Sequence, residues 1–186
     1  WNSPTARLNL RVGDERPFVP RFLTGAAPPL FVPPKKLRTR LFPDSQQELS
    51  LATAWRLVSD GQTVLIYCPE RRSVEPFAKV VVDLPSRGAL ASLLTVDPAT
   101  LQTAIALGEE WLGPDSDILK CLRLGVALHH GALPTAYRKE VERLLRDSVL
   151  KVTISSPTLA QGLNLSATAV VMHSLYRHGE KIKVSE

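Results

Sequence analysis

The sequence predicts an α/β fold in which helices cover both faces of a parallel sheet. Four short apolar runs have the length of buried strands, at residues 63–68, 125–130, 150–155 and 169–174. Helical patterns with one apolar and one charged face lie between these runs. Buried strands that alternate with amphipathic helices are typical of parallel sheets covered on both sides.

The composition is that of an ordinary globular protein of 186 residues, with 44% hydrophobic and 22% charged residues. No apolar run approaches membrane-spanning length and nothing resembles a signal peptide, so we expect a cytoplasmic protein with no membrane partner. The net charge of +5 suggests a polyanionic partner without proving one. The chain begins at Trp1 and its only methionine is Met172, so we expect a fragment or a processed product.

The two cysteines, Cys68 and Cys121, lie in or beside apolar segments and match no metal-binding spacing. We expect both to be reduced core residues of a cytosolic protein. A disulfide between them is the alternative.

Residues 1–44 are predicted to form an N-terminal strand and a proline-rich arm or interdomain connection. Alternating apolar and polar residues over 6–12 indicate a half-buried strand. Frequent prolines between Pro17 and Pro43 disfavour helix and central strand, although short edge pairing is expected around 30–32. The basic run at 35–40 is either a solvated linker, which we prefer, or a nucleic-acid contact.

Regular structure is predicted to begin at residue 45. Asp44 or Ser45 can cap a helix that ends at Asp60, and its apolar positions include Leu49, Ala52, Trp55 and Val58. After the strand at 63–68, a loop leads to a helix that ends near Val82, and an irregular stretch over 83–96 follows. Two further helices are predicted over 97–111 and 115–123.

The last third of the chain contains the other three strands. Pro134 begins an amphipathic helix, and its apolar face consists of Tyr137, Val141, Leu144 and Leu145. After the strand at 150–155, Ser155 and Ser156 stand where a helix cap is wanted, and Pro157 fits the first helical position. Gly162 then breaks this short helix, and a further buried strand is predicted over 169–174.

Three polar segments follow predicted strands: PERRS at 69–73, HHGAL at 129–133 and SSPTLAQG at 155–162. Ligands of parallel sheets bind at the carboxyl ends of the strands, so these segments should lie along one edge. The edge would combine two arginines, two histidines, hydroxyl groups and at least one helix N-terminus. Such a set favours a ligand rich in phosphate.

Each group on this edge also has a purely structural explanation. The two arginines are equally expected as solvated residues at a helix start. No carboxylate or cysteine stands at a metal-ligand spacing from His129 or His130, so no metal site is predicted. One histidine should pack at the strand end and the other should hydrogen-bond backbone or phosphate. Arg138 either reaches a phosphate or, by default, pairs with Glu142 four residues later.

The sequence contains no GxxxxGK[ST] phosphate loop and no acidic pair that ends a strand and would hold magnesium. The chain is therefore not expected to bind and hydrolyse a nucleotide by itself in the P-loop manner. Any phosphate site that it forms should be half of a larger one.

Three segments together resemble motifs IV, IVa and V of superfamily-two helicases: VLIYCPERR, then GVALHHGAL with YRKEVE, then VTISSPTLAQGLNLSATAVVMHSLYR. They are most similar to the DExH, Ski-type branch. The resemblance covers residues 62–82 and 124–186 well, and the remainder poorly. It implies that residues 45–186 are the second RecA-like domain, or helicase C-terminal domain, of such a protein, which stops before motif VI.

The resemblance further implies an ATP-dependent helicase or translocase that acts on single-stranded DNA or RNA. ATP and magnesium would be held mainly by a first RecA-like domain outside this chain, with Gly162 and Asn164 facing the nucleotide. The nucleic-acid contacts would come from Arg71, Arg72, His130, Gly131, Ser156 and Thr158. No catalytic residue is implied within the chain, which is expected to be inactive alone because the arginine-bearing motif VI is missing.

The chain departs from the family pattern in three places. Pro69 and Glu70 stand where serine or threonine is frequent, HHGAL replaces HHAGL, and Ser166 replaces a usual proline. These departures motivate an alternative, a non-catalytic RecA-like module that binds nucleic acid or a protein. A third reading, a small enzyme acting on a phosphorylated substrate, lacks a nucleophile and base at plausible spacing.

Overall fold

The computed structural model describes residues 32, 35–37, 40–157 and 167–181. The chain divides into two units, residues 1–33 and residues 34–186, and all the described helices and strands belong to the second. The predicted strand at 6–12 lies outside the described residues. Val32, which was expected to take part in edge pairing, is described and lies in no strand.

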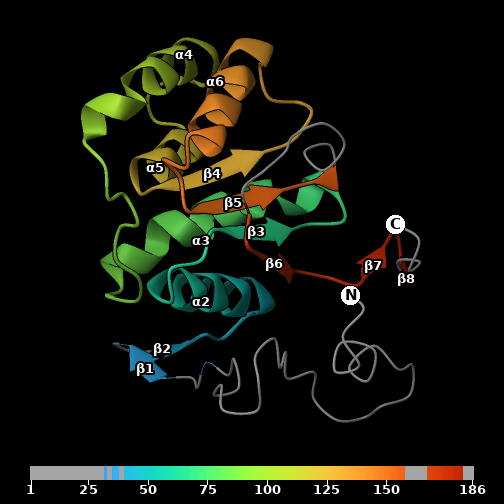
Figure 1. The fold of residues 1–186 in the computed structure, drawn as a ribbon. Helices are drawn as coiled ribbons and strands as arrows, with labels where there is room; N and C mark the ends of the chain where they lie inside the picture. The colour runs from blue at the N-terminus through green and yellow to red at the C-terminus, as the bar shows by residue number, and fades with distance from the viewer. Residues whose placement is uncertain (1–31, 33–34, 38–39, 158–166, 182–186) are drawn as a thin grey trace. The chain divides into compact units, whose positions relative to one another are not determined.

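The second unit is built on a four-stranded parallel sheet with the order β4-β5-β3-β6 (Figure 1). Its strands are β3 (Val64–Tyr67), β4 (Val126–His129), β5 (Val152–Ser155) and β6 (Ala169–Met172). Every residue of β4 and β5 is buried, as expected for strands that are covered on both faces. The flanking helices and the parallel order confirm the predicted α/β fold, which is of the RecA-like type.

Five α-helices and two short 3-10 helices are described around the sheet. They are α2 (Gln46–Ser59), η1 (Arg71–Ser73), α3 (Glu75–Ser86), η2 (Pro98–Leu101), α4 (Gln102–Leu112), α5 (Asp117–Arg123) and α6 (Thr135–Arg146). Helix α2 contacts β3 and β6, α5 and α6 contact β4, and α3 lies against α2 and α5. The hydroxyl of Ser45 accepts a hydrogen bond from the Glu48 amide at 3.1 Å, so Ser45 is the predicted cap of α2.

Helix α6 buries the four residues that the sequence predicts. Tyr137, Val141, Leu144 and Leu145 are all at most 3% exposed, within a cluster that also includes residues of α4 and α5. Because these residues recur at helical spacing, burying them fixes which way the charged face of α6 points. That face carries Arg138 and Glu142.

The two cysteines are free and buried, which confirms that they are reduced. Burial raises the pKa of the Cys68 thiol to about 12. The pKa of Cys121 is also raised to about 12, mainly by burial. Both thiols therefore stay protonated and unreactive at neutral pH.

Strand β6 differs from the prediction of a buried strand over 169–174. Val170 is 55% exposed and Met172 is 44% exposed, while Ala169 and Val171 are only half-buried. The physical reason is the strand order, since β6 lies at the edge of the described sheet and pairs with β3 alone. An apolar run of this kind predicts a strand but not its place in the sheet.

Helix α2 also presents a different face from the one predicted. Leu49 is 46% exposed, and the fully buried residues are Leu51 and Ala54, neither of which was among the apolar positions expected. Ala52 is buried as expected.

Helix α3 is longer than predicted and ends at Ser86 rather than near Val82. Pro85 looks like a stop signal, but it lies in the last turn, where it removes a single backbone hydrogen bond. Leu84 is fully buried and continues the apolar face of the helix to this point. The remainder of the stretch expected to be irregular, residues 87–96, does lie outside helices and strands.

Two small antiparallel pairs were not predicted. Strand β1 (Lys35–Leu37) pairs with β2 (Arg40–Phe42), so part of the basic run is a strand rather than a linker. Strand β7 (Tyr176–Arg177) pairs with β8 (Glu180–Lys181) around His178 and Gly179, which both have positive φ.

No helix in the described part of the chain is long and apolar enough to cross a membrane.

Candidate functional site

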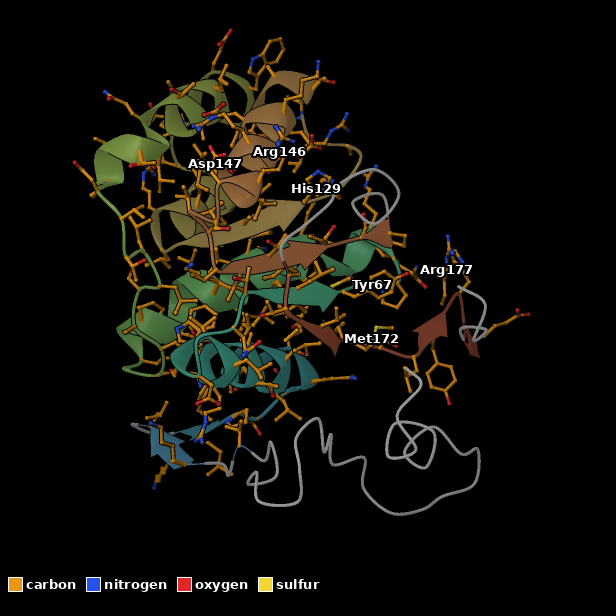
Figure 2. The ribbon with its side chains drawn as sticks, in the orientation of Figure 1. Tyr67, His129, Arg146, Asp147, Met172 and Arg177 are labelled. Atoms are coloured by element: carbon orange, nitrogen blue, oxygen red, sulfur yellow. The ribbon has the colours of Figure 1, made fainter. Side chains whose placement is uncertain are left out.

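The carboxyl ends of the parallel strands lie level with one another. Ser155, the last residue of β5, pairs in register with both Tyr67 of β3 and His129 of β4. Tyr67 in turn pairs with Met172 of β6. Figure 2 shows Tyr67, His129 and Met172 at this end of the sheet. The prediction that the three polar segments share one edge is therefore confirmed for their described residues, and we call this edge the carboxyl edge.

The β3 loop places Arg71 and Arg72 in the 3-10 helix η1, with both side chains exposed to solvent. Glu70 occupies the N-cap position of η1 but makes no capping hydrogen bond with its side chain. Its carboxylate forms an ion pair with Arg72. The other Glu70 oxygen accepts a hydrogen bond from the His178 amide at 2.7 Å. Glu70 thus joins the β3 loop to the turn between β7 and β8.

The same contacts explain the ionisation of Glu70. Its pKa is lowered, first by the hydrogen bond from the His178 amide and then by Arg72. Glu70 therefore stays a carboxylate at neutral pH, and it neutralises one of the two arginines that were predicted to contact phosphate.

Two buried histidines end strand β4. The Nε2 atom of His129 lies 2.9 Å from Oε1 of Glu142, while its Nδ1 atom has no hydrogen-bond partner among the described residues. His130 is 2% exposed, and neither of its ring nitrogens has such a partner. Its Nε2 atom lies 3.4 Å from Oε1 of Glu75, without the geometry of a hydrogen bond.

Burial lowers the pKa of both histidines, more than the neighbouring carboxylates raise it. Both rings are therefore neutral at pH 7. Neutral imidazole supplies one donor and one acceptor, and both ring nitrogens of His130 are buried, so its N–H is not open to a ligand in this conformation.

The turn after β4 is held by Arg138 from helix α6. Its Nη1 donates a hydrogen bond to the carbonyl of Gly131 at 3.2 Å. Its Nε lies 3.7 Å from Oε1 of Glu142, so the default pairing predicted for Arg138 is present. The additional bond to Gly131 was not predicted.

The turn after β5 begins with buried residues. Ser156 is 2% exposed, and its amide donates to the carbonyl of His129 at 3.2 Å. The Ser155 hydroxyl donates to the carbonyl of Ser156 at 2.8 Å. Thr158, Gly162 and Asn164 lie outside the described residues, as does Ser166.

Among the predicted contact residues, the structure thus brings Arg71, Arg72, His130, Gly131 and Ser156 to one edge, the first two exposed and His130 and Ser156 buried. Sequence reasoning missed Glu75 and the double role of Glu142. Both are charged side chains on helices that directly follow a strand end, and this position is the signal that could have found them.

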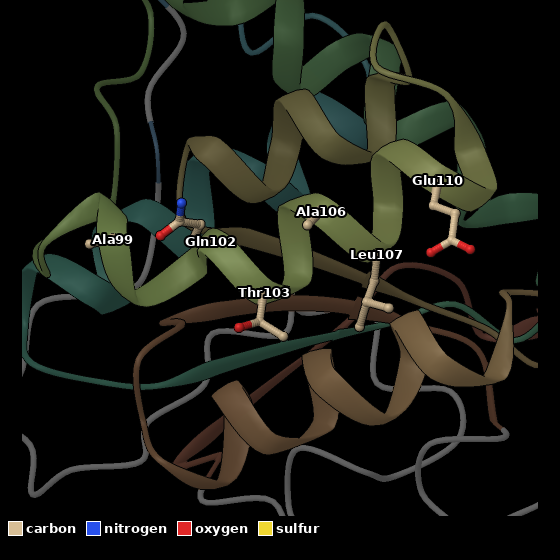
Figure 3. Close-up of a pocket in the computed structure, with 6 residues that line it drawn as sticks. All are labelled: Ala99, Gln102, Thr103, Ala106, Leu107 and Glu110. Carbon is tan, nitrogen blue, oxygen red and sulfur yellow. The ribbon is translucent and has the colours of Figure 1, made fainter.

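One hollow on the surface lies away from this edge. Figure 3 shows it along helix α4, where it is lined by Ala99, Gln102, Thr103, Ala106, Leu107 and Glu110. No residue of the carboxyl edge lines it, and its lining comes only from η2 and α4. It is therefore not part of the candidate site. The described ranges also contain no group of three or more His, Cys, Asp or Glu residues that could hold a metal ion.

Comparison with known proteins bears on this site. No protein-family model matches the chain. The chain is 30% identical over 141 residues to Hachiman protein HamB of Bacillus cereus, which aligns 76% of this chain with 12% of HamB. It is 31% identical over 148 residues to ATP-dependent DNA helicase Hel308 of Thermoplasma volcanium, or 77% of this chain and 20% of the relative.

A second Hel308, from Methanococcus vannielii, is 38% identical over 125 residues, which are 66% of this chain and 16% of the relative. The chain therefore matches 12% to 20% of the length of these three relatives. These relatives and the parallel sheet support a helicase-type α/β module of the C-terminal kind, in agreement with the resemblance of the motifs.

Proposed function

We propose that the chain is the second RecA-like domain of an ATP-dependent DNA or RNA helicase of superfamily two, in the DExH, Ski-type branch. The carboxyl edge is the observation that carries this proposal. It brings the segments that resemble motifs IV, IVa and V to one level of the sheet. The similarity to proteins named as ATP-dependent DNA helicases supports it further.

In this proposal the carboxyl edge is part of the track for a single strand. The exposed guanidinium of Arg71 would meet the backbone phosphates, because arginine offers several N–H donors in a fixed fork. Thr158 would contribute a hydroxyl, and His130 and Gly131 would line the track, with the ring of His130 beneath the surface. Contacts of this kind recognise the backbone, so binding should depend on salt and little on base sequence.

ATP bound between two RecA-like domains would supply the energy for strand movement. In this chain Gly162 and Asn164 are the proposed nucleotide-facing residues. Since the described residues contain no cluster that could hold a metal ion, they do not fit a magnesium site. We therefore assign magnesium to the first RecA-like domain and derive no chemical step within this chain.

Single-strand binding tests the proposed track. The affinity of the chain for a fluorescent oligothymidylate should fall as salt increases, and an Arg71→Ala/Thr158→Ala variant, which removes one positive charge, should bind more weakly with a salt slope smaller by about 0.7–1. The matched control is Arg123→Ala/Thr103→Ala, which removes the same residue types from α5 and α4. Equal affinity of the wild type and the first variant would remove Arg71 and Thr158 from the track.

A second candidate is a non-catalytic RecA-like module that binds nucleic acid or a protein. The ion pair between Glu70 and Arg72 favours it, because a carboxylate occupies a guanidinium of the proposed track. The flanking sequence of the whole protein discriminates between the two functions. A phosphate loop with a DExH box upstream and a GRxGR motif downstream would support the motor, and their absence would support the module.

A further inference from the structure

Three consecutive carbonyl groups of the β4–α6 turn each accept a hydrogen bond. The carbonyl of His129 accepts from the Ser156 amide at 3.2 Å, and that of His130 accepts from the Leu133 amide at 3.1 Å. The carbonyl of Gly131 accepts from Nη1 of Arg138 at 3.2 Å. The first bond links this turn to the β5 turn, and the last links it to helix α6.

Glu142, on helix α6, contacts two of the residues that take part in these bonds, His129 and Arg138. Its Oε1 atom lies 2.9 Å from Nε2 of His129 and 3.7 Å from Nε of Arg138. One carboxylate oxygen therefore contacts both the last residue of β4 and the arginine that holds Gly131. The side chain of Glu142 is 20% exposed and that of His129 is 3% exposed, so solvent screens this contact poorly.

The contact also selects the tautomer of His129. Because the ring is neutral, Nε2 must carry the proton to donate to the carboxylate, and Nδ1 is left as the acceptor. The ring orientation is thereby fixed at the point where the chain leaves β4. The next two residues are His130 and Gly131, both on the proposed strand track.

We propose that Glu142 is a positioning residue of the carboxyl edge, which through His129 and Arg138 holds the β4–α6 turn in the conformation that binds a phosphate backbone. This proposal rests on the proposed function for its ligand. Glu142 itself is not expected to touch the strand, since a carboxylate repels phosphate.

Whether Glu142→Ala lowers or raises the affinity for a single strand separates this positioning role from a simple effect of charge. Replacing Glu142 by alanine removes a negative charge, which alone would strengthen binding to a polyanion. The proposal predicts the opposite, a loss of affinity for oligothymidylate of about tenfold, the size expected for one lost hydrogen bond to a charged group.

Glu140→Ala is the matched control. Glu140 lies on the same helix and carries the same charge, and it pairs with Arg143 at 2.7 Å within α6. Its removal should leave strand affinity unchanged or raise it slightly. Glu142→Gln keeps an oxygen that can accept from His129, so its affinity should lie between those of wild type and Glu142→Ala. If Glu142→Ala does not fold, Glu142→Gln is the variant that tests the positioning role.

Amide exchange provides a readout that needs no ligand. In Glu142→Ala the amides of Leu133 and Ser156 should exchange faster than in wild type, whereas Glu140→Ala should leave them unchanged. Unchanged exchange in the Glu142 variants, or strand affinity equal to or above wild type, overturns the positioning role. Wild-type chain that binds no strand even at low salt overturns the proposed function instead, and with it the ligand of this turn.

Discussion

Gly125 immediately precedes β4, and its replacement by alanine should destabilise the chain more than that of any glycine open to solvent. Its φ of +83° lies in the left-handed region. A Cβ atom there would lie 2.6 Å from the Leu94 amide nitrogen and 2.7 Å from the Leu93 carbonyl carbon. Both are backbone atoms, so no side-chain rotation relieves the clash.

Gly61→Ala separates the cost of backbone strain from the cost of the steric clash. It has the same φ of +83°, but a Cβ atom at this position would meet nothing within 4 Å. Gly61→Ala should therefore cost only the backbone strain, about 1–2 kcal/mol of unfolding free energy. Gly125→Ala adds the clash, for which overpacking costs of about 1–3 kcal/mol are typical. The Leu93 amide would also have to shift from the Leu124 carbonyl, which it now contacts at 2.9 Å.

Urea unfolding followed by circular dichroism measures both variants. The expected result is a lower midpoint at an unchanged slope, with a loss for Gly125→Ala that exceeds the loss for Gly61→Ala by about 1–3 kcal/mol. Equal losses would show that the 93–94 backbone yields to a Cβ atom. The close approach of residues 93–94 to the start of β4 would then not constrain the sequence.

Three further predictions concern ionisation and activity. Glu70→Gln should weaken the link between the β3 loop and the His178 turn, seen as an altered His178 amide shift. Because the pKa of Glu70 is lowered, in wild type this link should survive through the usual titration range of glutamate and be lost only as pH falls through the lowered value. Burial lowers the pKa values of His129, His130 and His173, so stability to urea should fall as pH drops below about 6.5, where the unfolded chain binds more protons. His130→Gln should flatten this dependence, and an equally steep profile would exclude His130 as a contributor. Finally, the purified chain should hydrolyse no ATP by itself, and measurable ATPase activity would contradict the assignment of the catalytic groups to other parts of the protein.

The elements that the sequence predicted well are those in which one periodic pattern determines burial. Helix α6 is the clearest case, because the spacing of Tyr137, Val141, Leu144 and Leu145 leaves a single way to bury them. Strand β6 shows where this reasoning ends. Its sequence AVVM is more apolar than the VTIS of the buried β5, but its exposure depends on strand order, which no local pattern contains.

The candidate site also has a part that the sequence predicted and a part that it did not. The meeting of the polar segments at one edge followed from the rule for parallel strands, because it requires only the direction of each strand. The contacts of Glu142 with His129 and of Glu70 with the His178 amide join residues 13 and 108 positions apart. They depend on how helices and turns pack, so the sequence could mark Glu142 by its place on the helix after β4 but could not identify the partner of either carboxylate.

Mapping a bound single strand by amide exchange tests the central claim most directly. With oligothymidylate at saturation, the account predicts protection of amides within residues 69–73, 129–133 and 155–157, the three segments at the carboxyl edge. Protection confined to the outer face of α4 or to the β1–β2 pair, with the carboxyl edge unchanged, would contradict it.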